Sequence, residues 1–385
     1  MIEVLIILII IFFIFVYLIT KKYQNANLSN SMYSAEYYRG LNYLLNDEDD
    51  KALKIFTDLI DVDSSTIETH LALGGVYRRR GEFDKAILIH QNLLSRPKLD
   101  KSIKNQTLYE LGKDFFSAGL YDKSEKILLN LKDNKSYDES CSEYLLLIYE
   151  LSKDWDSAIS FSKSLKKNII RNLSIDLLIS QYYCEKASDY NKDNQLNKAI
   201  TVLRKAQNTY NDGKRPYSML FTINIKSNPS IALDNLVSLL EIDPNFIIIL
   251  SNEIIQLSTI HQDKNIDKRI YDIIIKYSKE NHFSPKIYEF MFNVNECKSP
   301  DDYIFKTKKN VFTNIFNNLY MRDNTNNKES QTNLDLLNLI NENFLTYSCN
   351  NCGYSAKNYI WQCPSCNNWE TIKPNTISDR VSLND

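Results

Sequence analysis

An internal repeat limits the fold of this chain more narrowly than any other pattern in its sequence. The segment LGGVYRRRGEFDKAI at 73–87 is followed by LGKDFFSAGLYDKSE at 111–125, with Leu-Gly, an aromatic residue, a second glycine and Asp-Lys in register. Further copies lie at 40–56 and 145–159, which sets a period of about 34 to 38 residues. A repeat of this length predicts stacked pairs of antiparallel helices, because one pair cannot bury its apolar face alone.

Composition and residue size also favour helices. The chain has only eight glycines and eight prolines in 385 residues, too few turn residues for a strand-rich fold. Small residues recur where the two helices of a pair would approach closely: Gly40, Ala52, Gly74, Ala86, Gly112 and Ala158. The pattern L-G-x2-Y…A-x3-F…P resembles the tetratricopeptide repeat. We therefore expect an all-α tetratricopeptide-repeat solenoid over 33–321, clear at 33–165 and degenerate at 180–321.

Beyond residue 180 the repeat is harder to follow. The segments 196–210 and 229–244 are predicted as second helices of repeats, and Asp243-Pro244 is predicted to end the latter. Such a solenoid has no catalytic core and usually presents a surface to a peptide or protein segment. Arg78, Arg79 and Arg80 are interpreted as a solvated edge. The four histidines are interpreted as structural: His70, His90, His261 and His282. These features predict a binding scaffold and not an enzyme.

The N-terminal segment is strongly apolar. Val4 to Ile19 is almost wholly apolar, and the one charge before Lys21 is Glu3. This length approaches the roughly 20 residues that cross a bilayer, and the segment lacks the basic start and small-residue cleavage site of a signal peptide. We therefore predict a retained transmembrane helix at 1–20 and a juxtamembrane linker at 21–32. Lys21 and Lys22 then place the bulk of the chain in the cytoplasm by the positive-inside rule.

Four of the seven cysteines lie close together near the C-terminus. They form two C-x-x-C pairs: Cys349 with Cys352, and Cys363 with Cys366. Each pair can fold into a tight turn that offers two thiolates to one metal ion. Gly353 and Asn367, which follow the pairs, tolerate the left-handed backbone conformation that such turns use. Paired cysteines in a reducing cytoplasm are metal ligands more often than disulfides, so we predict that all four bind one metal ion.

The role of this metal follows from its ligands. An all-thiolate tetrahedral shell suits both zinc and iron. It leaves no open coordination position, which favours a structural role in a domain too small to fold alone. A rubredoxin-like iron site for electron transfer is the alternative, although no flavin, haem or nicotinamide motif accompanies it. The only basic residues within 347–374 are Lys357 and Lys373, against Glu370, so nucleic-acid binding is not predicted.

The segments around the cysteines complete the predicted organisation. We expect a polar linker at 322–333, a connecting helix at 334–346, the four-cysteine domain at 347–374 and a flexible tail at 375–385. The segment YIWQ at 359–362 is predicted as a short strand. Four aromatic residues are expected to pack beside the metal and to dock on the connecting helix or the repeats: Tyr354, Tyr359, Trp361 and Trp369. The isolated cysteines are interpreted as small buried apolar residues: Cys141, Cys184 and Cys297.

The order of these parts resembles one known family. A membrane helix, the repeat HLALGGVYRRRGEFDKAI at 70–87 and the cysteine segment CGYSAKNYIWQCPSCNNWETIKP at 352–374 resemble the lipopolysaccharide assembly protein B family. The resemblance is densest at 37–160 and 334–374 and weak from 180 to 330. It implies a rubredoxin-type metal-binding domain whose four ligands correspond to the four paired cysteines.

The resemblance also implies a function. The family acts at the bacterial inner membrane, where it restrains lipopolysaccharide synthesis by helping the membrane protease FtsH degrade the deacetylase LpxC. It is held in check by an inner-membrane protein that senses lipopolysaccharide. From the resemblance we expect a single-pass adaptor with its bulk on the cytoplasmic side, and a homo-oligomer is compatible with this role. A membrane-anchored rubredoxin-like electron-transfer protein is the alternative.

Overall fold

The computed structural model describes residues 67–95, 99–166, 168–277 and 346–375, with single positions between 35 and 55 and at 287 and 290. The chain divides into two compact units, Met1–Lys153 and Asp154–Asp385. Several predicted features lie outside the described residues: the transmembrane helix at 1–20, the linkers at 21–32 and 322–333, residues 334–345 of the connecting helix, His282 and Cys297. Within the described ranges, no helix combines the length and apolar character needed to cross a membrane.

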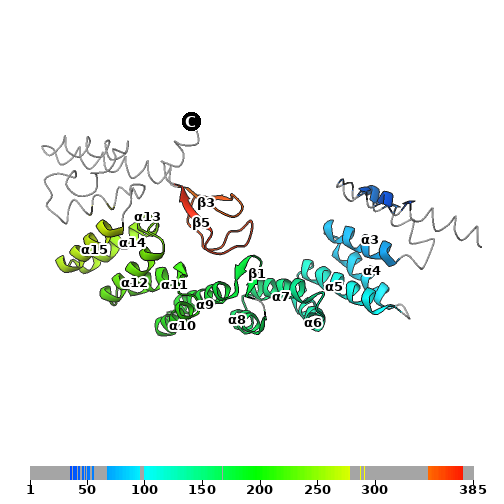
Figure 1. Ribbon diagram of the computed structural model, residues 1–385, viewed down its shortest axis with the longest axis horizontal. Coiled ribbons are helices and arrows are strands. Elements are labelled where there is room, and N and C mark those ends of the chain that lie inside the picture. Colours follow the sequence, from blue (N-terminus) through cyan, green and yellow to red (C-terminus); the bar gives the residue numbers. More distant parts are fainter. Residues whose placement is uncertain are drawn as a thin grey trace, which may run out of the picture. The chain divides into compact units, whose positions relative to one another are not determined.

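In the first unit, the helices follow one another as packed hairpins (Figure 1). Their bounds are α3 (Ile67–Arg79), α4 (Phe83–Leu94), α5 (Lys101–Ser117), α6 (Tyr121–Lys132) and α7 (Asp138–Ser152). Each packs against the next along the chain, because connections of a few residues return every helix alongside its predecessor. The helical repeat predicted from the sequence is confirmed in this unit.

The second unit contains a longer series of helices. Their bounds are α8 (Trp155–Ser164), α9 (Ile175–Lys192), α10 (Leu196–Thr209), α11 (Lys214–Asn224), α12 (Pro229–Ile242), α13 (Phe246–Ile249), α14 (Ser251–His261) and α15 (Lys264–Tyr277). α9 packs on α10 and α11 packs on α12, which confirms the two second helices predicted at 196–210 and 229–244. α12 ends at Ile242, directly before Asp243-Pro244, as predicted. Phe221, Leu236 and Phe246 are fully buried in the core between α11, α12 and α13.

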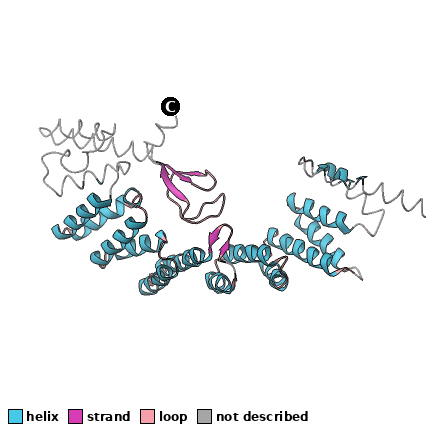
Figure 2. Cartoon of the chain, in the orientation of Figure 1, coloured by secondary structure: helices cyan, strands magenta, loops and turns pink. Residues whose placement is uncertain are grey.

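Strands occur at two places in the second unit (Figure 2), so the fold is mostly helical and not all-α. A hairpin of β1 (Ile169–Ile170) and β2 (Leu173–Ser174) lies between α8 and α9 and was not predicted. The turn of this hairpin, Arg171-Asn172, has φ angles of 50° and 60°, which suit a tight two-residue turn. The other strands belong to the four-cysteine domain.

The close helix contacts predicted at small residues are present. Gly74 of α3 faces the imidazole of His90 on α4, and a Cβ at this glycine would overlap the ring. A Cβ at Gly112 of α5 would lie 3.0 Å from Leu128 Cδ2 of α6. Ala86 and Ala158 are completely buried. These residues therefore let the helices pack closely, as the repeat pattern indicated.

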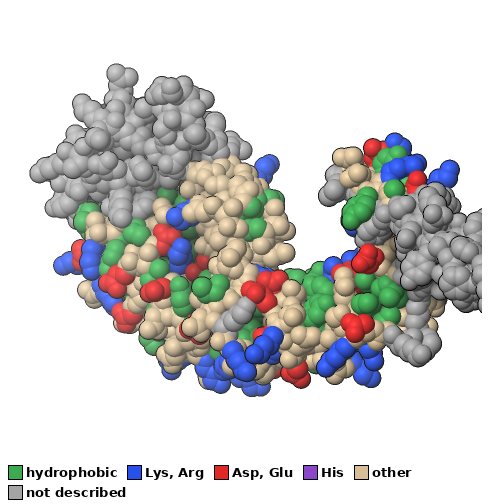
Figure 3. Space-filling model, turned by 45° about the vertical axis from the view of Figure 1, so that its right-hand side comes forward, with side chains coloured by type: hydrophobic (Ala, Val, Ile, Leu, Met, Phe, Trp, Pro, Cys, Tyr) green, Lys and Arg blue, Asp and Glu red, His purple; other side chains and the backbone are tan. Residues whose placement is uncertain are grey.

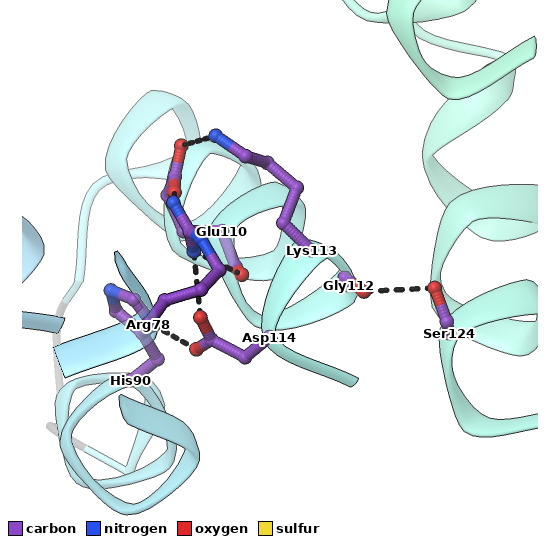
Figure 4. A network of polar contacts seen from close by, with 7 residues as sticks. All are labelled: Arg78, His90, Glu110, Gly112, Lys113, Asp114 and Ser124. Carbon is purple, nitrogen blue, oxygen red and sulfur yellow. Dashed lines mark hydrogen bonds and ion pairs between the residues drawn. The ribbon is translucent and has the colours of Figure 1, made fainter. Parts of the chain in front are cut away.

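The interpretation of Arg78 as part of a solvated edge is wrong (Figure 4). Its guanidinium donates through Nη1 to Asp114 Oδ1 and through Nη2 to Glu110 Oε2, both at 2.6 Å. His90 Nδ1 lies 2.5 Å from Asp114 Oδ2, and both of these side chains are fully buried. The buried carboxylate of Asp114 binds the guanidinium because a buried charge needs hydrogen-bonded partners. Of the three arginines, only two are exposed: Arg79, the last residue of α3, and Arg80, which follows it.

Candidate metal centre

The four-cysteine domain, called the ribbon below, is a small antiparallel sheet with two loops. β3 (Thr346–Cys349) lies between β4 (Ser355–Ala356) and β5 (Ile372–Asn375). Thr346 pairs with Asn375, so the sheet extends one residue beyond each bound predicted for this domain. Asn375, predicted as the first residue of the tail, is therefore the last residue of a strand; residues 376–385 lie outside the described ranges.

The prediction of a strand at 359–362 is wrong. Only Gln362 makes an isolated bridge, to Trp369. The side chains of Tyr359 and Trp361 instead contact Phe246 of α13. The segment packs on a helix through its aromatic rings and adds no strand to the sheet.

Backbone hydrogen bonds hold each cysteine pair in a tight turn. The N–H of Gly353 donates to the carbonyl of Cys349 at 2.9 Å, and the N–H of Asn367 donates to the carbonyl of Cys363 at 2.8 Å. Gly353 and Asn367 have φ angles of 76° and 55°. Both residues adopt the left-handed conformation expected from the sequence, which glycine and asparagine tolerate best.

The two turns bring four sulfur atoms together. All four Sγ atoms lie within 4.8 Å of one another, and none is in a disulfide. Cys349 Sγ is 3.7 Å from Cys366 Sγ, and Cys352 Sγ is 3.5 Å from Cys363 Sγ. Sulfurs around a tetrahedral metal with bonds of about 2.3 Å are about 3.8 Å apart. This geometry fits one tetrahedral metal ion, and the donor set suits both zinc and iron.

The environment of the sulfurs favours thiolate at one cysteine of each pair, whereas burial raises the pKa of Cys363 to about 11. Although burial raises the pKa of Cys349, hydrogen bonds with the Thr371 hydroxyl and the backbone N–H groups of Cys352 and Asn351 lower it to about 6. Burial likewise opposes a lowered pKa at Cys366, where the Asn351 side chain and the Asn368 backbone stabilise the thiolate. Metal ligation requires deprotonated sulfur, so these hydrogen bonds favour the form of Cys349 and Cys366 that could bind a metal ion.

The isolated cysteines lie apart from this cluster. Cys141 and Cys184 are completely buried in α7 and α9, as predicted. Burial raises the pKa of the Cys141 thiol to about 11 and that of Cys184 to about 12. Both are therefore protonated, unreactive core residues at neutral pH.

Sequence analysis missed the residues that seat the ribbon on the helices. The Glu370 carboxylate accepts hydrogen bonds from Gln181 Nε2 of α9 at 2.8 Å and from the backbone N–H of Arg215 in α11 at 3.0 Å. No local pattern marks Glu370, and in the sequence it counted only as a negative charge near two lysines. The face of the ribbon seen in Figure 3 carries few charged side chains. The Glu370 carboxylate is partly buried where the ribbon meets the helices.

Aromatic residues form the rest of this contact. Trp361 stacks on Phe246, with ring centroids 5.7 Å apart, and Tyr359 meets the same ring edge-on at 5.6 Å. The Arg215 guanidinium lies over Trp361 and Trp369, at 5.9 Å and 5.3 Å from their ring centroids. The predicted docking of the ribbon aromatics on the repeats is thus confirmed for Tyr359 and Trp361.

Comparison with known proteins supports the same organisation. Residues 347–374 match a family model described as a rubredoxin metal-binding domain, and 69–103 match one described as a tetratricopeptide repeat. Lipopolysaccharide assembly protein B of Escherichia coli K12 is 27% identical over 364 residues, which cover 91% of this chain and 92% of that protein. Its Haemophilus influenzae counterpart is 28% identical over 387 residues, which cover 92% of each chain.

The chain is thus similar to lipopolysaccharide assembly protein B over nearly its whole length. The rubredoxin-type model coincides with the ribbon, and the repeat model covers α3 and α4. Among solved structures, the C-terminal part of a repeat protein from Cytophaga hutchinsonii is 13% identical with a TM-score of 0.40, covering 66% of this chain and 98% of that one.

Proposed function

We propose that this chain is a non-enzymatic adaptor in lipopolysaccharide assembly that binds other proteins through its helical repeats. The observation that carries this proposal is the similarity of 91% of the chain to relatives named for lipopolysaccharide assembly. The ribbon supports it, because a centre with four thiolate ligands has no free position at which a substrate could bind the metal. Stacked repeats supply the extended surface that an adaptor needs.

We propose that Cys349, Cys352, Cys363 and Cys366 hold one metal ion, zinc or iron. Their sulfurs have the spacing that a tetrahedral thiolate centre needs, and hydrogen bonds favour the thiolate form of Cys349 and Cys366. The metal supplies a cross-link between the two loops of a domain with only three short strands. Bound iron that is reversibly bleached on reduction would favour the electron-transfer alternative, and bound zinc would exclude it.

The adaptor is proposed to act at the bacterial inner membrane. Residues 1–20 would anchor it with its bulk on the cytoplasmic side, and the repeats would present the deacetylase LpxC to the protease FtsH. An inner-membrane protein that senses lipopolysaccharide would restrain it, and a homo-oligomer is compatible with these roles. A membrane anchor raises the effective concentration of an adaptor near membrane-bound partners.

The half-life of LpxC tests this function. Depletion of the chain should lengthen the half-life and raise lipopolysaccharide, and restoring the full chain should reverse both effects. A chain that lacks residues 1–20 should restore regulation poorly at the same abundance, because tethering is lost. An unchanged half-life on depletion would show that this protein does not control LpxC degradation. Full restoration of regulation by the truncated chain would refute the role of the anchor.

A further inference from the structure

Helix α11 begins without a capping side chain of its own. Its N-cap residue is Gly213, and its first turn contains no acidic residue but starts with Lys214 and Arg215. The N–H groups at a helix N-terminus lack intrahelical acceptors, and positive charge there is unfavourable. Many helices begin with Ser, Thr, Asp or Asn at the N-cap, and the side-chain oxygen of this residue accepts a hydrogen bond from one of these N–H groups. α11 therefore needs an acceptor, and preferably an anionic one, from elsewhere in the chain.

The ribbon provides that acceptor. The Glu370 carboxylate accepts from the backbone N–H of Lys214 at 3.1 Å and from that of Arg215 at 3.0 Å. Gln181 Nε2 of α9 donates to the same carboxylate at 2.8 Å. One side chain of the ribbon thus satisfies two backbone donors of α11 and holds α9 beside them.

The loops that carry the cysteines fix the position of Glu370. Its φ angle is 56°, a left-handed conformation that a residue with a Cβ keeps only when its surroundings enforce it. Its N–H donates to the carbonyl of Trp361 at 2.8 Å. The next residue, Thr371, bonds through its hydroxyl to Cys349 Sγ at 3.2 Å and accepts through its carbonyl from the N–H of Asn350 at 2.9 Å. Glu370 is therefore braced by contacts to the metal-binding turns.

Arg215 makes a second link between the helices and the ribbon. Its guanidinium lies over the rings of Trp361 and Trp369 and donates through Nη2 to Glu185 of α9 at 2.8 Å. Its Nε and Nη1 atoms are buried and have no hydrogen-bond acceptor among the described residues. The two indole faces therefore add to the stabilisation that the Glu185 carboxylate gives this buried cation. That stabilisation exists only while the ribbon is seated.

We propose that the metal-loaded ribbon is a cap for helix α11, with Glu370 as the positioning residue that couples metal binding to docking. The inference rests on the metal centre proposed above. Metal binding orders the loops that hold Glu370, Trp361 and Trp369, and these side chains then stabilise the start of α11. Coupling of two equilibria is reciprocal, so docking on α9 and α11 in turn retains the metal.

The test uses the full chain and the variants Glu370→Gln and Asp212→Asn. Glu370→Gln keeps the size of the side chain but removes its charge. Asp212→Asn removes the same unit of negative charge beside α11, but from an exposed residue just before Gly213 that is not part of the ribbon. Metal content is measured first, then the rate of metal release to an excess of chelator. Hydrogen exchange of the backbone amides of residues 214, 215, 217 and 218 is measured with and without metal; Pro216 has no amide hydrogen.

Glu370→Gln is expected to release metal about 5-fold or more faster than both the unmodified chain and Asp212→Asn. Removal of the metal from the unmodified chain is expected to increase exchange of these four amides. A release rate equal to that of Asp212→Asn, or exchange that does not respond to the metal, would overturn the coupling while leaving the metal centre intact. Absence of bound metal from the unmodified chain would instead refute the metal centre itself.

Discussion

Asp114 links three helices through one buried carboxylate. It accepts hydrogen bonds from Arg78 of α3 and His90 of α4, while its own backbone lies in α5. A buried carboxylate that lost these donors would keep a large desolvation cost, so the contacts select one arrangement of the helices. The imidazole of His90 reaches Asp114 across Gly74, where a side chain would fill the space that the ring occupies.

Gly74→Ala should therefore destabilise the first unit. The added methyl group would collide with the His90 ring, and overpacking of this kind costs about 1–3 kcal/mol. Thermal unfolding followed by circular dichroism should show a lower midpoint.

The neighbouring glycine offers a matched control for this substitution. A Cβ at Gly75 would meet nothing closer than Arg78 Nη2 at 3.9 Å. Gly75→Ala should leave stability unchanged or raise it by about 0.5–1 kcal/mol, because alanine favours the helix. Equal effects of the two substitutions would contradict the proposed role of the His90 contact.

The helical pairs share a turn that the repeat pattern only partly reveals. Three turns that join the two helices of a pair contain one residue with φ between 59° and 78°: Gly81, Gly119 and Asn194. Only the first two are glycines, so the left-handed backbone conformation is kept where the glycine of the sequence repeat is replaced by another residue. The backbone conformation is retained because tertiary packing supports it even in residues that adopt it less readily.

The same pairs share a contact between an aromatic ring and a lysine. A lysine amine lies over a ring eight residues earlier in three of them: Tyr77 with Lys85 at 5.3 Å, Phe115 with Lys123 at 5.4 Å and Tyr190 with Lys198 at 5.7 Å. The aromatic residue lies in the last turn of the first helix and the lysine in the first turn of the second. The contact therefore joins the two helices across the turn between them. The recurring aromatic and lysine positions in the sequence follow from this geometry.

Arg215→Lys should weaken the contact between α11 and the ribbon. An ammonium group cannot lie flat on two indoles and also pair with Glu185, and we expect a loss of about 1–3 kcal/mol. Tryptophan fluorescence during denaturant unfolding should report earlier exposure of the ribbon.

Arg204→Lys is the control for this change, because Arg204 is exposed on α10. It should leave the fluorescence transition in place. A transition that is identical in both variants would show that the planar guanidinium contributes little to docking.

For the chain as a whole, stability is divided between neighbouring elements. Helices of a repeat array gain most of their stability from adjacent helices, so loss of one end does not unfold the rest. The ribbon differs, because the buried residues of its apolar core are few: Tyr347, Cys349, Cys363 and Ile372. Its order is expected to depend on the metal and on the seat provided by α9, α11 and α13.

The double variant Cys349→Ser with Cys352→Ser separates these contributions. It should lose its metal equivalent and the order of the ribbon, while far-ultraviolet circular dichroism retains most of the helical signal. Metal content by elemental analysis is the decisive measurement.

Cys184→Ser serves as the comparison, because this buried thiol of α9 lies apart from the four sulfurs. It should keep one equivalent of metal. A double variant that still bound one equivalent would disprove the ligand assignment, and metal loss from Cys184→Ser would show that the assay reports general unfolding.

The sequence by itself determined the local features of this protein: the helical pairs, the close contacts at Gly74 and Gly112, and the two cysteine turns. Each depends on residues near one another in the chain, so spacing and residue type were sufficient. Only the tertiary structure decided that Arg78 is paired with Asp114 and that Glu370 caps a helix whose first residue is Lys214. These partners lie far apart in sequence, and any carboxylate brought to the same place could bind the same donors. Packing therefore selects them, because the loss of hydration on burial must be offset by whichever donors the fold brings within reach.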